Sequence, residues 1–357
     1  MRIGLVGGIF GASPDYRART LWTPETTLLE GLSALGHEVD ALAHRQLSSY
    51  EGYEIVHVHH FGRGAVAASL DRSRAKLVFT QHQSQQRSWS RRAGVWHTMR
   101  CADAVVALTA VLAERERNLY PVPSRHVVIP NGIKTEHLPF TQRYRPAAAE
   151  PWVILYAGQL VRFKRVDVLI RAVARLQDRV PLRLKLAYHN PQYEVQLRSL
   201  VGELGLGDVV EFLGALSQPQ LALLQRSSHL VVLPSDSSEA MPGVVSEAMM
   251  CGTPIVATDV GGVREQLGGF GLMVRPGDEA SLARALTEAF DNYETYASRG
   301  RDMATVARAR FSIETVARAH ERLYLELLGS GEPRRTLGMW PTANTVIRVG
   351  MSHWLPS

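Results

Sequence analysis

The chain has 357 residues, too many for one ordinary domain and suited to two domains of about 150 to 200 residues each. With 45% hydrophobic and 21% charged residues, the composition excludes a wholly disordered or collagen-like chain. No apolar run reaches the ~18 residues of a transmembrane segment. The apolar start ends at Gly7-Gly8 without a cleavage site, so we expect a first strand rather than a signal peptide.

The net charge is +6, and only four of the 40 basic residues are lysines. Such an excess of arginine fits either an arginine-rich coding bias or a protein that handles anionic groups. No basic block with interleaved aromatic residues occurs, so phosphate on a small molecule is a better predicted partner than nucleic acid. Cys101 and Cys251 lie far apart without metal-ligand spacing, which indicates no zinc site and a reducing, cytoplasmic compartment.

Short apolar runs alternate with helical spacing along the chain, a pattern typical of parallel sheets covered on both faces. In the first half, strands are predicted at residues 3–6, 38–43, 55–58, 77–80, 104–108 and 127–129, with a helix at 24–35. After residues 141–151, which have no periodicity, strands are predicted at 153–156, 182–187, 209–212, 230–233 and 254–257, with helices at 166–176 and 281–296.

This organisation predicts an α/β protein with two doubly wound, Rossmann-like domains at residues 1–145 and 146–328 and an irregular tail at 329–357. Ligands of such sheets bind beyond the carboxyl ends of the strands. Two units that face each other would therefore enclose a cleft between those ends.

The most informative stretch is residues 234–254, where a strand ends, a Ser-rich loop follows and a helix begins near Gly243. Free N–H groups at a helix start suit a phosphate or sugar oxygen, although Pro242 cannot donate one. Glu239 lies in the loop and Glu247 on the helix, eight positions apart. Taken alone, each of these two glutamates is also consistent with an ordinary solvated carboxylate on the surface.

The Glu-x7-Glu spacing with Pro-Gly between, followed by the Gly-x-Pro and Gly-Gly-Val-x-Glu stretches up to Glu265, resembles the donor site of GT-B glycosyltransferases. The likeness is greatest to the large retaining group called family four, the glycosyl transferases group 1. Further matching motifs stand at residues 128–133, 157–164, 212–214 and 271–277, and in the first half at 7–8, 36–39, 57–59 and 80–82. The resemblance covers about residues 1–328 and not the tail.

The resemblance implies a bacterial-type enzyme that moves a sugar from a nucleoside diphosphate, UDP before GDP, to a hydroxyl or amine of a small molecule, lipid or glycan. The configuration of the sugar would be retained. The sequence contains no Asp-x-Asp metal motif, so the protein itself must stabilise the diphosphate leaving group and no metal or other cofactor is expected. A non-catalytic nucleotide-sugar-binding protein and a nucleotide-sugar epimerase of the same fold remain open alternatives.

By resemblance, His82, Glu239 and Lys164 are the catalytic residues, with Lys164 at the diphosphate. The residues implied to bind the donor are Gly7, Gly8, Gln159, Arg162, Lys164, Leu213, Gly214, Met241, Pro242, Gly243, Val244 and Glu247. Glu239 would contact sugar hydroxyls, and Glu247 would hold the ribose diol. His59 and His60 would line the acceptor site, or alternatively pack in the sheet. These histidines have no carboxylate nearby in sequence, so metal binding by them is not expected.

Two features depart from the family pattern or lie beside it. Gln159 stands where the family has an arginine, and either Arg162 or Arg165, the latter in place of a glycine, is a candidate to supply the missing charge. A basic, aromatic helix carries Arg87, Arg91, Arg92 and Arg100 with Trp89 and Trp96. Such a helix is either an ordinary solvated face, or a site for an anionic acceptor or an acidic membrane surface.

Overall fold

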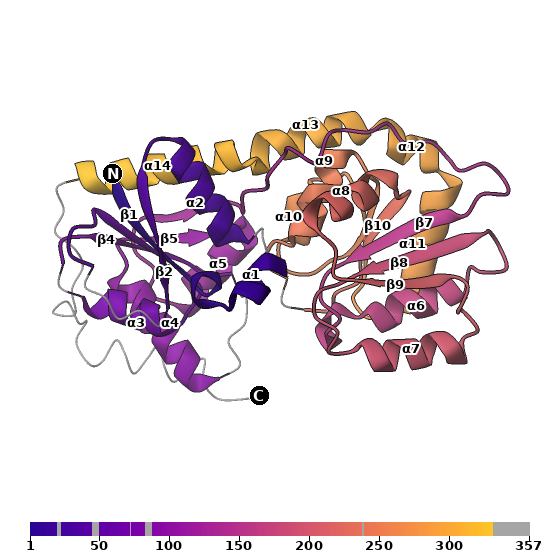
Figure 1. The fold of residues 1–357 in the computed structure, drawn as a ribbon, viewed down its shortest axis with the longest axis horizontal. Helices are drawn as coiled ribbons and strands as arrows, with labels where there is room; N and C mark the ends of the chain where they lie inside the picture. Colours follow the sequence, from indigo (N-terminus) through magenta and orange to yellow (C-terminus); the bar gives the residue numbers. More distant parts are fainter. Residues whose placement is uncertain (20–22, 45–49, 72, 83–87, 238, 331–357) are drawn as a thin grey trace.

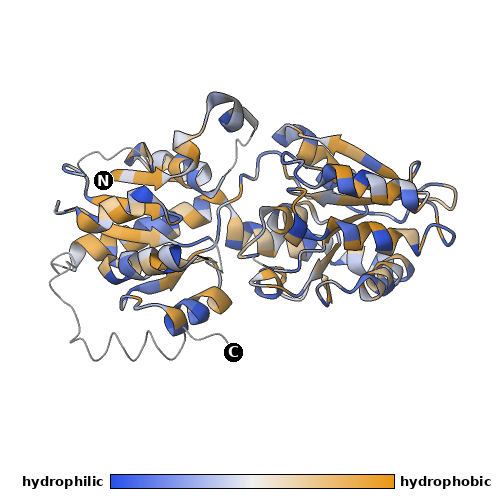
Figure 2. Cartoon of the chain, turned by 90° about the horizontal axis from the view of Figure 1, so that it is seen from below, coloured by the Kyte–Doolittle hydropathy of each residue, from blue (hydrophilic) through white to orange (hydrophobic). Residues whose placement is uncertain are grey.

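The computed structural model describes residues 1–19, 23–44, 50–71, 73–82, 88–237 and 239–330. Two parallel six-stranded sheets, each covered by helices, form two units that lie side by side (Figure 1). The predicted α/β architecture is confirmed. Figure 2 shows the same units with the apolar residues concentrated on the strands and on the inward faces of the helices.

The first sheet has the strand order β2-β1-β3-β4-β5-β6. Its strands are β1 (Arg2–Gly7), β2 (Glu38–Ala43), β3 (Ile55–His59), β4 (Lys76–Thr80), β5 (Ala104–Ala107) and β6 (His126–Val128). The helices of this half are α1 (Pro14–Arg19), α2 (Pro24–Ala34), α3 (Arg63–Leu70), α4 (Trp89–Cys101) and α5 (Ala110–Leu119). Every residue of β3, β4 and β5 is buried, as expected for inner strands of a parallel sheet that is covered on both faces.

The second sheet has the order β12-β11-β10-β7-β8-β9. Its strands are β7 (Trp152–Ala157), β8 (Leu182–Ala187), β9 (Val210–Gly214), β10 (Leu230–Leu233), β11 (Ile255–Thr258) and β12 (Leu272–Val274). The helices are α6 (Val166–Ala174), α7 (Glu194–Glu203), α8 (Gln218–Ser227), α9 (Gly243–Cys251), α10 (Val263–Leu267), α11 (Glu279–Asp291), α12 (Tyr293–Ser298), α13 (Gly300–Phe311) and α14 (Ile313–Gly329).

The last helix, α14, returns to the first sheet, whereas the predicted boundary placed residues up to 328 in the second unit (Figure 1). Leu323 and Tyr324 of α14 are buried in the same apolar core as Leu5 of β1. Gly31 of α2 permits the close packing, because a Cβ there would lie 2.8 Å from Cβ of Ala317. The amphipathic pattern of α14 predicts a buried face but does not specify which sheet covers it.

The predicted helix at residues 281–296 is divided at Asn292, whose φ of −110° and ψ of 28° are not helical, so α11 and α12 are separate. The strand β12 was not predicted as a strand. Cys101 and Cys251 are buried and free. Among the residues that the structure describes, no helix combines the length and apolar character needed to span a bilayer. Most of the predicted tail, residues 331–357, lies outside the described residues.

A polar contact joins the two units near the start of α5. Both carboxylate oxygens of Glu265, on α10 of the second unit, accept backbone hydrogen bonds from α5, from Ala110 N at 2.9 Å and from Val111 N at 3.2 Å. Gly262 lies against Thr109, where a Cβ would approach Cγ2 to 2.4 Å. The second unit therefore caps a helix of the first.

Candidate active site

The second sheet changes strand order between β7 and β10, where the loops that follow two adjacent strands diverge. Lys164 lies in the loop after β7 and Glu239 in the loop after β10. The ammonium of Lys164 donates to Oε1 of Glu239, and Ser235 Oγ donates to the same oxygen at 2.5 Å. Both charged side chains are mostly covered, with 15% and 7% of their surfaces exposed. The structure thus brings two of the predicted catalytic residues together.

The loop that carries Lys164 is held by Arg165, which adopts the left-handed conformation with φ of +47°. This backbone geometry is one that glycine adopts more readily than a residue with a side chain, which fits the glycine that the resemblance implies at this position. The Arg165 guanidinium lies 3.1 Å from the Asp167 carboxylate and 3.6 Å from that of Asp236. Arg165 is therefore engaged in tying the two loops together. Arg162 is exposed and has no ion pair with any residue in the described part of the chain.

Gln159 follows β7 at the same edge of the sheet. Its backbone oxygen accepts a hydrogen bond from the Tyr156 hydroxyl at 2.7 Å. Its side-chain nitrogen lies 3.4 Å from Nε2 of His189, which follows β8. Gln159 thus lies beyond the carboxyl end of β7 and presents a neutral amide there.

Glu247 lies on α9 beside a pocket of about 190 Å³. The pocket is also lined by Gly158, Tyr188, His189 and Gln218. The Glu247 carboxylate accepts a 3.2 Å hydrogen bond from Gln225, and burial raises its pKa to about 7. A carboxylate that can accept hydrogen bonds from two neighbouring hydroxyl groups at the rim of such a pocket suits a cis diol.

The start of α9 is fixed from both units. Met241 is buried, and its sulfur accepts a contact of 3.3 Å from the backbone N–H of Asn131 in the first half of the chain. The Pro242 carbonyl accepts a 3.0 Å hydrogen bond from Gln266. The helix then begins at Gly243, with Val244 lining the pocket of Glu247. At the next strand end, Leu213 and Gly214 close β9, Gly214 with a positive φ of 67°.

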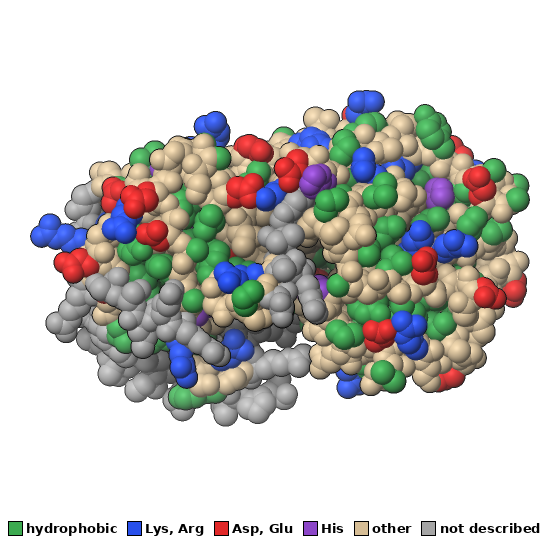
Figure 3. Space-filling model, viewed as in Figure 1, with side chains coloured by type: hydrophobic (Ala, Val, Ile, Leu, Met, Phe, Trp, Pro, Cys, Tyr) green, Lys and Arg blue, Asp and Glu red, His purple; other side chains and the backbone are tan. Residues whose placement is uncertain are grey.

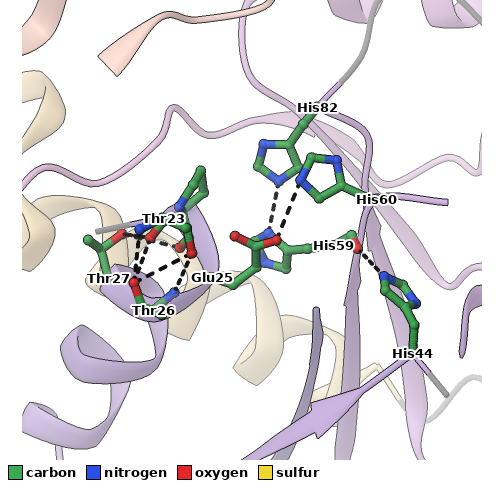
Figure 4. Close-up of polar contacts among 9 residues, drawn as sticks. Thr23, Glu25, Thr26, Thr27, His44, His59, His60 and His82 are labelled. Carbon is green, nitrogen blue, oxygen red and sulfur yellow. Dashed lines mark hydrogen bonds and ion pairs between the residues drawn. The ribbon is translucent and has the colours of Figure 1, made fainter. Parts of the chain in front are cut away.

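Histidines gather at the carboxyl ends of β3 and β4 in the first unit (Figure 4). His59 Nδ1 lies 2.9 Å from Nε2 of His82, and the His60 ring centroid lies 4.2 Å from that of His82. Burial and the neighbouring imidazoles lower the pKa of His82 well below its ordinary value, so the ring is neutral near pH 7. His59 is 3% exposed, which supports its alternative as a packing residue, whereas the His60 side chain is 38% exposed.

A carboxylate from α2 faces this cluster, although none lies near these histidines in sequence. Oε1 of Glu25 lies 3.4 Å from Nε2 of His60 (Figure 4), although 35 residues separate them. Gly7 allows the approach, since a Cβ there would come within 2.8 Å of the Glu25 Cγ. Gly7 therefore makes room for a side chain of the chain itself. Gly8 follows without such crowding, its nearest neighbour lying 4.0 Å away.

Within the described residues, no group of three or more His, Cys, Asp or Glu side chains has the geometry of a metal site. The basic helix is α4, where Trp89 is 70% exposed and the Arg100 guanidinium lies 6.0 Å from the Trp96 ring centre. Arg87 lies outside the described residues. On the face seen in Figure 3, basic and acidic side chains are interspersed over both units.

Two family models match the chain, glycosyl transferases group 1 over residues 141–304 and glycosyltransferase family 4 over residues 41–137. A D-inositol 3-phosphate glycosyltransferase of Arthrobacter sp. (strain FB24) is 30% identical over 312 residues, covering 80% of this chain and 73% of the relative. The chain belongs to the family-four glycosyltransferases. A second D-inositol 3-phosphate glycosyltransferase, from Nocardia farcinica, is 32% identical over 68% of this chain and 59% of its own length.

Solved structures share the GT-B fold of this glycosyltransferase. Sucrose-phosphate synthase from Thermosynechococcus elongatus superposes with a TM-score of 0.77 at 20% identity, over 93% of this chain and 100% of the other. HepE of Anabaena, crystallised in complex with UDP and glucose, superposes with a TM-score of 0.73 at 20% identity, over 91% and 100% of the two chains. At this identity the likeness concerns the fold alone.

In this glycosyltransferase, the sequence singled out Lys164 and Glu239, which meet in the structure, but it did not single out Glu25 of the first unit. The only signal was the helix start Pro24-Glu25, where an acidic residue in the first turn is common for helix-dipole reasons alone. Its burial, at 3% exposure, depends on packing against Gly7 and is not encoded in that local pattern.

Proposed function

We propose that this glycosyltransferase transfers a sugar from a nucleoside diphosphate, preferentially UDP, to an acceptor hydroxyl or amine with retention of configuration and without a divalent cation. The observation that carries the proposal is the meeting of Lys164 and Glu239 where the second sheet changes strand order. An ammonium that is already fixed at a strand end can offset the charge that develops on a diphosphate leaving group.

Different residues around this pair would bind different parts of the nucleotide-sugar donor. Lys164 and the first N–H groups of α9, at Gly243 and Val244, would hold the diphosphate. Glu247 would accept the two ribose hydroxyls beside its pocket, and Glu239 would contact the sugar. From the first unit, the neutral His82 would accept or donate one hydrogen bond at the reacting face of the sugar.

The acceptor would bind to the first unit, at the exposed side of His60. The two inositol-phosphate relatives make a phosphorylated cyclitol the first acceptor to test. Closure of the two units over the donor would exclude water from the activated sugar.

The decisive experiment incubates the protein with UDP-glucose, UDP-N-acetylglucosamine and GDP-mannose, each with D-inositol 3-phosphate and with water alone as acceptor. Release of UDP, and an NMR signal for the retained anomer in the product, would support the proposal. The measurement is repeated with EDTA, which should leave the rate unchanged. Binding of nucleotide sugar without any turnover would favour the non-catalytic alternative, and a changed sugar still attached to UDP would favour an epimerase.

A further inference from the structure

Glu25 lies in the first unit, beside the histidines that follow β3 and β4. It occupies the first turn of α2, a helix that begins after Thr23 with a side-chain cap to Thr26 N. The residue is 3% exposed, and its carboxylate contacts the half-exposed ring of His60. A buried carboxylate is costly unless it is paired or hydrogen-bonded, so its placement requires a reason.

The backbone of His60 brings its ring to Glu25. His60 has a left-handed φ of +63°, which is unfavourable for most residues and uncommon outside glycine, asparagine, aspartate and histidine. The conformation is held by a hydrogen bond of 3.0 Å from His60 N to the Thr80 carbonyl of β4. It brings the His60 ring into contact with both the Glu25 carboxylate and the ring of His82 (Figure 4).

The shape of β1 fits the same arrangement. Gly7 ends this strand, and any larger residue would collide with Cγ of Glu25 at 2.8 Å and with the Phe10 ring at 3.2 Å. Three separate local features therefore converge on one contact: a glycine at the end of β1, a strained histidine after β3 and a buried carboxylate on α2.

We propose that Glu25 is a positioning residue that holds His60 as the Nε2–H tautomer, so that Nδ1 of His60 accepts a hydrogen bond from the hydroxyl of the acceptor. Nε2 faces Glu25 and must carry the proton for the contact to be favourable. In the described part of the chain, the only polar contact of the His60 ring is that of Nε2 with Glu25, so Nδ1 has no hydrogen-bond partner there. The inference rests on the proposed function and adds the residue that orients the acceptor.

The charges around His60 decide when Nδ1 is available. Burial lowers the pKa of His60, the Glu25 carboxylate raises it, and His44 beyond β2 and Arg91 of α4 lower it. His82, whose ring centroid lies 4.2 Å from that of His60, is itself neutral because burial holds its pKa low. Below the pKa of His60, Nδ1 is protonated and cannot accept the hydroxyl, so transfer should decline on the acidic side.

The test compares Glu25→Gln, His60→Gln and the double variant with the wild type and with Glu30→Gln, a control on the exposed part of the same helix. Turnover is measured at saturating UDP-sugar, with water as the smallest acceptor and with D-inositol 3-phosphate. We expect Glu25→Gln and His60→Gln each to lower turnover at least tenfold, the double variant to match His60→Gln, and UDP affinity to stay within twofold. Glu25→Gln should also shift the acidic limb of the pH profile to lower pH.

Histidine NMR provides a readout that needs no acceptor. The His60 signals, assigned by their loss in His60→Gln, should show an unprotonated Nδ1 in the wild type and a mixture of tautomers in Glu25→Gln. Equal turnover in Glu25→Gln and Glu30→Gln, or a protonated Nδ1 in the wild type, overturns the inference. If the wild type consumes no nucleotide sugar, the proposed function fails, while the NMR result still tests the pair. Should Glu25→Gln unfold, the half-exposed His60→Gln carries the kinetic test.

Discussion

Lys164 and Glu239 lie 75 residues apart in sequence and form an ion pair that joins the loops after two adjacent strands. Glu239 also accepts a hydrogen bond from Ser235, so its Oε1 atom accepts two hydrogen bonds from the protein. A diphosphate that enters the site must attract the ammonium without leaving Glu239 unpaired. Hydroxyl groups of the donor sugar can take over that role, which would couple diphosphate binding to sugar recognition.

Lys164→Met should therefore affect both activity and stability. We expect turnover to fall about 10²- to 10³-fold, because charge on the leaving group is no longer offset. The melting temperature should also fall, since loss of one partner of a buried pair costs about 3–5 kcal/mol.

Lys164→Met with Glu239→Gln separates the two effects. Without its buried charge, the double variant should recover most of the melting temperature but none of the turnover. Recovery of both would mean that Lys164 acts only in folding.

Gln159→Arg should strengthen UDP binding about tenfold. A charge-assisted hydrogen bond to phosphate is worth ~1.5–3 kcal/mol, compared with ~1 kcal/mol for a neutral one.

If Arg162 supplies the missing charge, Arg162→Ala should weaken UDP binding in the wild type and have less effect in the Gln159→Arg background. Isothermal calorimetry at fixed salt measures both. Arg165→Ala is the comparison, because that guanidinium is already paired with two aspartates. Equal losses of UDP affinity in Arg162→Ala and Arg165→Ala would contradict the assignment of the compensating charge to Arg162.

The fold and the meeting of Lys164 with Glu239 were predictable from the sequence because their signals are local. Apolar runs such as β10 and the spacing between Glu239 and Glu247 occur within short segments. The strands β7 and β10 are parallel neighbours, so the loops that follow their carboxyl ends lie side by side. Lys164 and Glu239 meet for that reason.

Contacts that depend on tertiary packing were not predictable from local patterns. Glu25 meets His60 only because β1 ends in Gly7 and α2 packs over it. The amphipathic pattern of α14 fits either sheet, and only Gly31 and its neighbours select the first. The alternation of His57-Val58-His59 likewise indicates one face of a strand without showing that both rings are buried.

The raised pKa of Glu247 predicts that the stability of the protein and its affinity for ribose change with pH in opposite directions. Its folded-state pKa of about 7 lies above the ordinary 4.5, so the folded protein holds this proton more tightly than the unfolded chain. The associated stability is present below about pH 4.5 and is lost as pH rises to about 7, an effect of ~3 kcal/mol. Glu247→Gln should therefore raise the melting temperature at pH 8 and have little effect at pH 5.

The same ionisation should strengthen ribose binding, since the charged carboxylate accepts hydrogen bonds from hydroxyl groups better than the neutral acid does. Wild-type affinity for uridine, which has no titratable phosphate, should rise between pH 6 and 8, and Glu247→Gln should bind weakly at both. A uridine affinity that does not change with pH would place the ribose elsewhere.

Glu265 should fix the relative orientation of the two units, because its carboxylate caps α5 across their boundary. Loss of a helix cap costs ~0.5–2 kcal/mol, and here the lost contact is also one between units. Glu265→Ala should lower the melting temperature by a few degrees and increase the radius of gyration measured by X-ray scattering. Glu265→Gln, which keeps one acceptor oxygen, should show about half of each change. If scattering from Glu265→Ala matches the wild type while the melting temperature falls, Glu265 stabilises α5 without controlling the cleft.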